Sequence, residues 1–183
     1  MSAAGNWPAG TVFSLDGITP QIHESAFVAP TAVIIGDVVI GAETGVWFHV
    51  LIRGDMNVIR IGARTNIQDS VVVHVDSGGA ATMIGDDVTI GHSAVVHGCV
   101  LKNRAFVGIA STVLDGAVIE EGGMLGAGGL LTPGKVIGPN ELWTGSPAKL
   151  RRVMDEDERR RFDRNAIVYR DLAKRFRVGL KPA

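Results

Sequence analysis

The sequence is poor in cysteine and in aromatic residues. Its 183 residues include one cysteine, Cys99, and only 5% are Phe, Trp or Tyr. A single cysteine excludes an internal disulfide framework and indicates a reducing compartment. The scarcity of aromatic side chains argues against an ordinary globular core, which gains much of its volume from them.

The sequence also lacks an excess of charge and any long apolar run. The formal net charge is −1 and the pI is about 6.5, so we expect no nucleic-acid partner and no anionic membrane partner. The most apolar window, 32–40, contains Gly36 and Asp37 and is too short to span a bilayer. Residues 1–17 lack the basic and apolar regions of a signal peptide. We therefore expect a soluble, cytoplasmic protein.

What the sequence does contain is glycine, at 24 residues, and an aliphatic residue at every sixth position over about 22–148. The phase resets by three residues after Val58, is interrupted by an insertion at 76–83, and slips by one residue before Val107. The in-phase positions are Ile22, Val28, Ile34, Ile40, Val46, Ile52, Val58, Ile61, Ile67, Val73, Ile84, Ile90, Val96, Val107, Val113, Ile119, Leu125, Leu131, Ile137 and Trp143.

A period of six matches neither an α-helix nor an alternating strand. It suits a chain that turns a corner after each hexad, so that three hexads close one triangular coil. Each coil then buries its aliphatic side chains against those of the next coil. The sequence therefore predicts an all-β solenoid of parallel coils.

The six-residue register ends at Lys149, and the composition changes there. We predict a helix from Arg151 to Arg177 that packs along the solenoid, with Pro147 before it and Gly179 and Pro182 after it. Its apolar stripe is Val153, Met154, Phe162, Ala166, Tyr169, Leu172, Ala173 and Phe176. The predicted division is a β-helix domain at 1–148 and a helix with a tail at 149–183. The interleaved charges of the helix indicate a solvated face rather than a nucleic-acid site.

Three of the five histidines lie between Val73 and Cys99. Val73 and Val96 are three hexads apart, so the residues after them, His74 and His97, should occupy one face in successive coils. Stacked strands are about 4.7–4.9 Å apart. Both imidazoles could then reach one metal ion at Zn–N distances of about 2.0–2.1 Å.

The third histidine, His92, belongs to the preceding hexad and should lie around a corner from the other two. In a threefold assembly, one subunit's face can meet another face of its neighbour. The spacing therefore predicts a metal site that takes His74 and His97 from one chain and His92 from the next. Three imidazoles with one open position are typical of catalytic zinc. We interpret His23 and His49 as surface residues.

Polar residues accompany both histidine positions. The register places Arg53 one coil below His74 on the same face, and it places Gln68 beside the face of His92. The alternative for Arg53 and Asp55 is an ordinary surface ion pair, which contributes about 0–1 kcal/mol.

The combination of RGD at 53–55, NIQD at 66–69, His74 and GHSAVVHG at 91–98 resembles the γ-class carbonic anhydrase-like branch of the hexapeptide-repeat family. The segments SLDGITPQI, VAPTAVIIGDV and GSPAK extend the likeness over nearly the whole chain. The resemblance implies a left-handed parallel β-helix that assembles as a homotrimer. It also implies zinc, or iron or cobalt, bound across the subunit interface by His74, His92 and His97.

The resemblance assigns roles to further residues as well. It implies that Arg53 and Asp55 pair across subunits, that Gln68 orients the metal-bound hydroxide, that Asn66 and Asp69 surround the site, and that Tyr169 reaches it from the helix. The implied reaction is hydration of CO₂ to bicarbonate. Zinc lowers the pKa of its bound water to about 7, and the resulting hydroxide attacks CO₂.

One departure from the family pattern concerns proton export. Well-studied active members carry a glutamate after the Asp of the RGD-like motif and an acidic loop nearby. Here Met56 stands at that position, and the segment 76–83 contains only Asp76 as an acidic residue. Proton transfer would then depend on water, Asp76 or a nearby histidine, and we expect low activity.

Three alternatives remain open at this point, because this fold supports several functions. The chain could be a CoA-dependent acyltransferase, a thioesterase-like enzyme, or a non-catalytic subunit of a trimeric assembly. Cys99 could be a reactive thiol, but the sequence favours a small buried residue within a coil.

Overall fold

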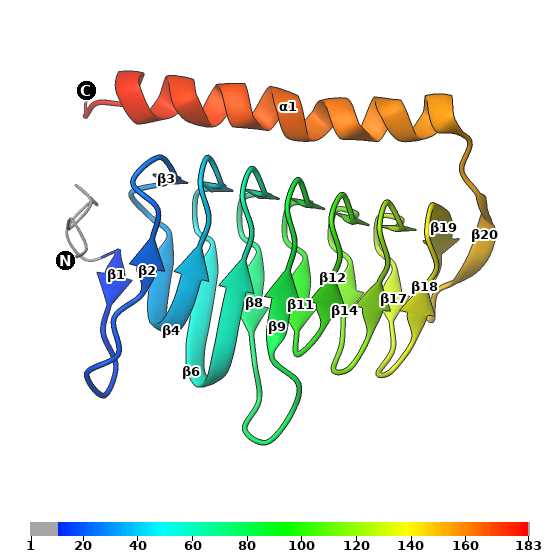
Figure 1. Ribbon diagram of the computed structural model, residues 1–183, viewed down its shortest axis with the longest axis horizontal. Helices are drawn as coiled ribbons and strands as arrows, with labels where there is room; N and C mark the ends of the chain where they lie inside the picture. The colour runs from blue at the N-terminus through cyan, green and yellow to red at the C-terminus, as the bar shows by residue number, and fades with distance from the viewer. Residues whose placement is uncertain (1–10, 183) are drawn as a thin grey trace.

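The computed structural model describes residues 11–182, which form a three-sided parallel β-helix with one long helix alongside it (Figure 1). The left-handed β-helix expected above is confirmed, with about seven turns. Residues 1–10, where we expect no signal peptide, and residue 183 lie outside the described part. A 12-stranded sheet covers two faces of the prism, because β4 and β6 bend around the edge between them, and an 8-stranded sheet forms the third face.

Each face is a stack of short strands, one from each coil. The first face carries β1 (Val12–Phe13), β4 (Val33–Ile40), β6 (Leu51–Ile61), β8 (Val72–His74), β11 (Val95–His97), β14 (Thr112–Val113) and β17 (Leu130–Leu131). The second face carries β2 (Gln21–Ile22), the latter halves of β4 and β6, β9 (Thr82–Ile84), β12 (Val100–Leu101), β15 (Val118–Ile119) and β18 (Val136–Ile137). The third face consists of β3 (Phe27–Val28), β5 (Gly45–Val46), β7 (Asn66–Ile67), β10 (Thr89–Ile90), β13 (Phe106–Val107), β16 (Met124–Leu125), β19 (Glu141–Thr144) and β20 (Lys149–Val153).

The hexad aliphatic residues form the core, as the period predicts. Most of them are fully buried and pack in one continuous cluster along the axis. Val58 is an exception, since it is only half-buried while its neighbour Ile59 is fully buried. The reason is an irregularity in the pairing of β4 with β6, because Gly36 pairs with Gly54 but Val38 pairs with Ile59. The alternation of side chains therefore changes phase within β6, and Ile59 and Ile61 point inward.

The corners of the prism explain the abundance of glycine. Many corners contain one residue with a left-handed backbone conformation, which glycine adopts without steric cost. In the later coils these residues include Gly116, Gly122, Gly128 and Gly134, with φ between 66° and 68°. Earlier coils place other residues there, such as Arg64 and Asp87.

The C-terminal helix, α1 (Glu156–Gly179), begins later than the predicted Arg151. Lys149–Val153 instead forms β20, which pairs antiparallel with β19 and covers the edge of that sheet, so Val153 is exposed rather than part of the helix stripe. Asp155 sets the start of α1, because its extended backbone lets its side chain accept the Glu158 N–H at 2.8 Å. Acidic residues fill the first turn, where the helix dipole favours them.

The helix packs along the third face and runs back over the solenoid (Figure 1). Phe176 on its inner side packs against Phe27 and Trp47 of the solenoid, and Ala173 is buried beside them. Lys174 also binds Glu43 at 2.9 Å. The predicted packing of the helix on the solenoid is therefore confirmed. Among the described residues, no helix is long and apolar enough to cross a membrane.

Cys99 is a core residue, as the sequence favours. Its thiol is fully buried, and burial raises its pKa to about 12. We therefore expect a thiol reagent such as Ellman's reagent to leave the native protein unmodified at pH 8, and to label one thiol per chain after denaturation. A Ser77→Cys variant, with an exposed added thiol, is the positive control. Labelling of native wild type at the rate of Ser77→Cys would contradict the prediction.

Candidate metal centre

The register of the first face places two histidines together. Strands β6, β8 and β11 align Arg53 with His74 and His74 with His97, which confirms the predicted stacking. His74 Nδ1 and His97 Nε2 face each other at 3.1 Å. Each imidazole is more than three-quarters buried, with 17% of the His74 side chain and 23% of the His97 side chain exposed.

The other nitrogen of each ring contacts a carboxylate. His74 Nε2–H donates to Asp55 Oδ1 at 3.0 Å, and His97 Nδ1–H donates to Asp115 Oδ1 at 2.9 Å. Asp115 is absent from the sequence-derived site. Strand pairing aligns Val96 with Val113, 17 residues later, so the coil here is one residue shorter than three hexads. Asp115 lies one residue beyond the position that this spacing aligns with His97, and counting coils therefore does not single it out.

Asp55 also binds Arg53 within the same chain. Burial of Asp55 favours its neutral form, but hydrogen bonds from His74 and the backbone, with the charge of Arg53, outweigh burial and lower its pKa. Asp55 is therefore an ionised acceptor at neutral pH. Pairing of Arg53 with Asp55 across subunits stays a prediction.

These contacts determine which histidine nitrogens carry protons. Carboxylate oxygens accept hydrogen bonds, so the nitrogens facing Asp55 and Asp115 carry the N–H. In neutral imidazoles the two remaining nitrogens, 3.1 Å apart, then present lone pairs to each other. Only a proton or a cation between them relieves this repulsion. Two nitrogens bound to one tetrahedral zinc at about 2.0–2.1 Å are about 3.3–3.4 Å apart, so the spacing fits a shared ion.

His92 lies on the other side of a corner, after β10 of the third face. Its Nδ1 contacts Asp69 Oδ2 at 3.0 Å, and its backbone N–H donates to Gln68 Oε1 at 3.1 Å. Its Nε2 is therefore the nitrogen left for a ligand. Within residues 11–182 of a single chain, no three His, Cys, Asp or Glu side chains come together as a metal-binding group. One chain thus holds two separate histidine positions.

Asn66 and Tyr169 both contact Trp47, where the helix packs on the third face. Asn66 is buried, and its Oδ1 accepts a hydrogen bond from Trp47 Nε1 at 2.8 Å. The Tyr169 ring meets Trp47 edge-on, with centroids 5.7 Å apart. Burial and the negative charge of Asp69 raise the pKa of Tyr169, so its hydroxyl stays protonated at neutral pH. Within the described residues, Asn66 stabilises the surface on which the helix packs, because it hydrogen-bonds to Trp47 rather than to a histidine.

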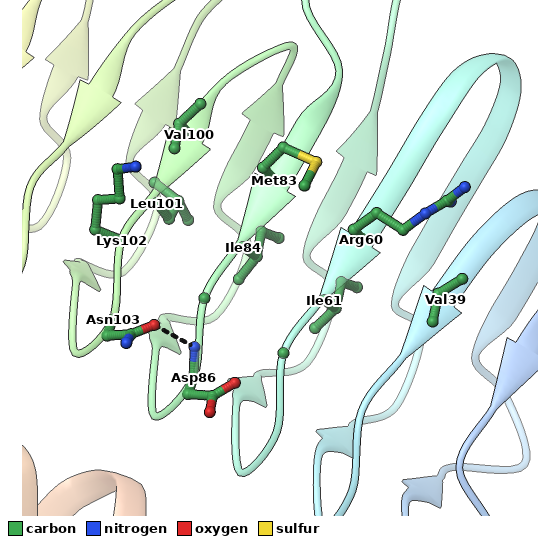
Figure 2. Close-up of a pocket in the computed structure, with 12 residues that line it drawn as sticks. Val39, Arg60, Ile61, Met83, Ile84, Asp86, Val100, Leu101, Lys102 and Asn103 are labelled. Carbon is green, nitrogen blue, oxygen red and sulfur yellow. Dashed lines mark hydrogen bonds between the residues drawn. The ribbon is translucent and has the colours of Figure 1, made fainter.

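A separate hollow lies on the second face (Figure 2). Arg60, Met83 and Val100 line it from the neighbouring strands β6, β9 and β12, and the Asp86 N–H donates to Asn103 Oδ1 at 2.9 Å beside them. No histidine lines this hollow. It is therefore distinct from the candidate metal centre.

Several named proteins are similar to this chain over most of its length. "Gamma carbonic anhydrase 2, mitochondrial" of Arabidopsis thaliana is 41% identical over 169 residues, covering 90% of the chain. The chain spans only 61% of the length of that plant relative. "Carbonic anhydrase" of Geobacillus kaustophilus is 48% identical, with 84% of each chain covered. "Carnitine operon protein CaiE" of Escherichia coli is 35% identical and covers 92% of this chain and 85% of its own.

Solved structures agree on the fold but carry other names. A hexapeptide transferase family protein from Anaplasma phagocytophilum is 46% identical, with a TM-score of 0.85, and the match covers 90% of this chain and 96% of that one. A Bacillus cereus protein with a provisional acetyltransferase name is 38% identical, with a TM-score of 0.89 and coverage of 91% and 96%. No family model matches the sequence.

Proposed function

Because the chain belongs to the γ-class carbonic anhydrase-like branch of the hexapeptide-repeat proteins, we propose that it hydrates CO₂ to bicarbonate at metal sites between subunits of a cytoplasmic homotrimer. One observation carries the proposal. His74, His92 and His97 each have one ring nitrogen on an aspartate, which leaves the other ring nitrogen free for a metal. This is the arrangement of histidines that ligate metals in proteins.

The residues present fit a divalent metal that prefers nitrogen ligands. His74 and His97 of one chain would supply two ligands, and His92 of the next chain would supply the third. A zinc, iron or cobalt ion held there supplies a water of lowered pKa, which gives a nucleophile near neutral pH. A set of three histidines would match the ligand number of catalytic zinc sites.

The surrounding side chains of this chain bind and orient the reactants. Gln68 is only 4% exposed, and its amide oxygen already accepts the His92 N–H, so its amide NH₂ is the group left to donate to an oxygen of CO₂ or bicarbonate. An amide does not titrate and so holds the nucleophile without competing for its proton. The protonated hydroxyl of Tyr169 is a second donor that the helix brings toward Asp69.

Asp55 and Arg53 have an ordering role. Asp55 fixes the orientation of His74 through its hydrogen bond, and this bond together with the positive charge of Arg53 lowers the pKa of Asp55. At the trimer seam we expect Arg53 and Asp55 to pair between neighbouring chains. Asn66 keeps Trp47 in place, and this positions the helix that carries Tyr169.

Proton export is the weak step in the proposed reaction. Met56, half-exposed at 54%, replaces an acidic residue next to Asp55, and the loop after β8 has only Asp76 as an acid. Each turnover must release a proton to solvent, so few acidic acceptors mean slow release at low buffer concentration. We therefore propose a slow hydratase whose rate increases with buffer concentration.

The second candidate is CoA-dependent acyl transfer. The transferase names of the two solved structures support it, as does a fold on which such enzymes are common. Thioester hydrolysis, or a non-catalytic role in a trimeric assembly, would use the same scaffold. These candidates do not require three histidines that each have a carboxylate partner.

Two measurements on wild type separate the candidates. We expect elemental analysis of protein purified without chelator to show about one zinc, iron or cobalt ion per chain. Stopped-flow CO₂ hydration should then exceed background and increase with buffer concentration. Absence of metal after reconstitution, together with acetyl-CoA binding by calorimetry, would replace the proposal by acyl transfer. Bound metal without hydration would favour the assembly subunit.

A further inference from the structure

The contact between Asp115 and His97 has a meaning beyond the residues that the sequence singles out. We propose that Asp115 is the positioning residue that holds His97 in the tautomer and orientation that aim Nε2 at the metal, an inference that rests on the proposed function. The contact joins successive coils, since β14, which precedes Asp115, stacks on β11, which ends with His97. The Asp115 carboxylate therefore lies directly beside the imidazole, 2.9 Å from its Nδ1.

The backbone at Gly98 makes room for this contact. A Cβ atom added at Gly98 would lie 2.3 Å from Asp115 Oδ1, and Gly98 has a φ of +52°. Both facts favour glycine directly after the histidine. The Gly116 N–H also donates to the Gly98 carbonyl at 2.7 Å, which joins the corner that carries Asp115 to the corner after His97. The backbone of two successive coils thus holds the Asp115 carboxylate beside the His97 imidazole.

The same arrangement occurs at the other two histidines. Asp55 contacts His74 and Asp69 contacts His92, at 3.0 Å in each case. Asp115 completes the set, so each candidate ligand has its own carboxylate. Three unrelated surface contacts would not be expected to involve all three candidate ligands. They would also not be expected to leave, in each case, one ring nitrogen available for the metal.

The chemical consequence concerns the proton of His97. A carboxylate that accepts the Nδ1–H stabilises the tautomer with its lone pair on Nε2 and prevents rotation of the ring. Nε2 is the atom 3.1 Å from His74 Nδ1. Without Asp115, His97 would divide its population between tautomers and orientations, and fewer molecules would be ready to bind metal.

The test compares Asp115→Asn and Gly98→Ala with wild type. Gly98→Ala should displace the Asp115 carboxylate without changing its charge. The control is Asp37→Asn, because Asp37 is also at a corner between the first and second faces but pairs with Arg60, at 2.7 Å. Zinc dissociation constants are measured by competition with a chelator. Nitrogen-15 NMR of the metal-free proteins reports the tautomer of His97.

We expect both site variants to bind zinc about 10- to 100-fold more weakly than wild type, whereas the control is unchanged. In metal-free wild type, His97 should be protonated at Nδ1, and in Asp115→Asn that preference should decrease. Equal affinity together with an unchanged tautomer in Asp115→Asn would overturn the inference while leaving the proposed function intact. Failure of wild type to bind any metal would instead remove the proposed function, and the metal-free tautomer would still decide the role of Asp115.

Discussion

Co-expression of a His92→Ala chain with a His97→Ala chain restores metal to about one quarter of the sites, whereas either variant alone binds none. The proposed site takes His74 and His97 from one chain and His92 from its neighbour. A site in the mixed trimer is complete when the first chain carries His92→Ala and the neighbour carries His97→Ala. Random assortment of equal amounts produces this pairing at about one site in four.

The structure supports this outcome because one chain separates the two kinds of histidine. His74 and His97 lie on the first face, and His92 follows β10 on the third face. The variants remove side chains that are partly exposed in the single chain, such as His92 at 38%, so we expect the coils to fold normally. Metal content and hydration rate should return together in the mixed trimers.

Metal is measured by elemental analysis of the hybrid trimers isolated with two affinity tags. This isolation removes trimers of identical chains, which have no complete site, so each hybrid should have one complete site in three. His23→Ala is the matched control, because His23 is exposed and, among the described residues, its side chain hydrogen-bonds to Ser25 in the same corner. It should keep the full metal content of wild type. Full metal in pure His92→Ala would show that His92 is not a ligand, and metal-free hybrids would show that the site does not lie between chains.

Replacing Trp47 by alanine lowers the free energy of unfolding by about 3–5 kcal/mol and loosens the helix from the third face. Trp47 is 3% exposed, and its ring centroid lies 5.2 Å from those of both Phe27 and Phe176. It also supplies the hydrogen bond to Asn66 Oδ1, and a buried acceptor that loses its donor accounts for about 1–3 kcal/mol of the total. The helix would keep only its polar contacts and a few apolar ones.

Chemical denaturation followed by circular dichroism measures the loss. Trp47→Phe is the matched variant, because it keeps an aromatic ring in the cluster and removes the indole donor, so it should lose only about 1–3 kcal/mol. If α1 detaches in Trp47→Ala, hydrogen exchange of its amides should accelerate more than that of the core strands. A midpoint equal to that of wild type would show that the aromatic cluster does not hold the helix.

The solenoid and the stacked histidines could be predicted because both follow from a period. Each hexad advances the chain by one face, so positions three hexads apart must lie in successive coils, and His74 must lie beside His97. The prediction was wrong where the period changes. Val58 was assigned to the core, but the irregular pairing of β4 with β6 changes the phase of alternation and places Ile59 there instead. Counting hexads does not reveal where a phase reset occurs.

The start of the helix was also mistaken, for a related reason. Residues from Arg151 onward have apolar positions that suit a helical stripe, but Lys149–Val153 pairs with β19. Backbone pairing at a sheet edge outweighs a weak helical preference, and Asp155 can cap a helix only where the chain leaves that strand. The local sequence pattern does not show that β19 would otherwise be an unpaired edge strand of the sheet.

The sequence by itself determined the repeating coil, the buried aliphatic ladder and the presence of two histidines in register, because these depend only on spacing along the chain. Tertiary structure alone decided which atoms meet at the corners. The Asp115 carboxylate reaches His97 because the backbone turns left-handed at Gly98, and Trp47 reaches Asn66 through stacked coils under the helix. Side chains at corners take their direction from the φ and ψ of each turn, and these depend on the neighbouring coils.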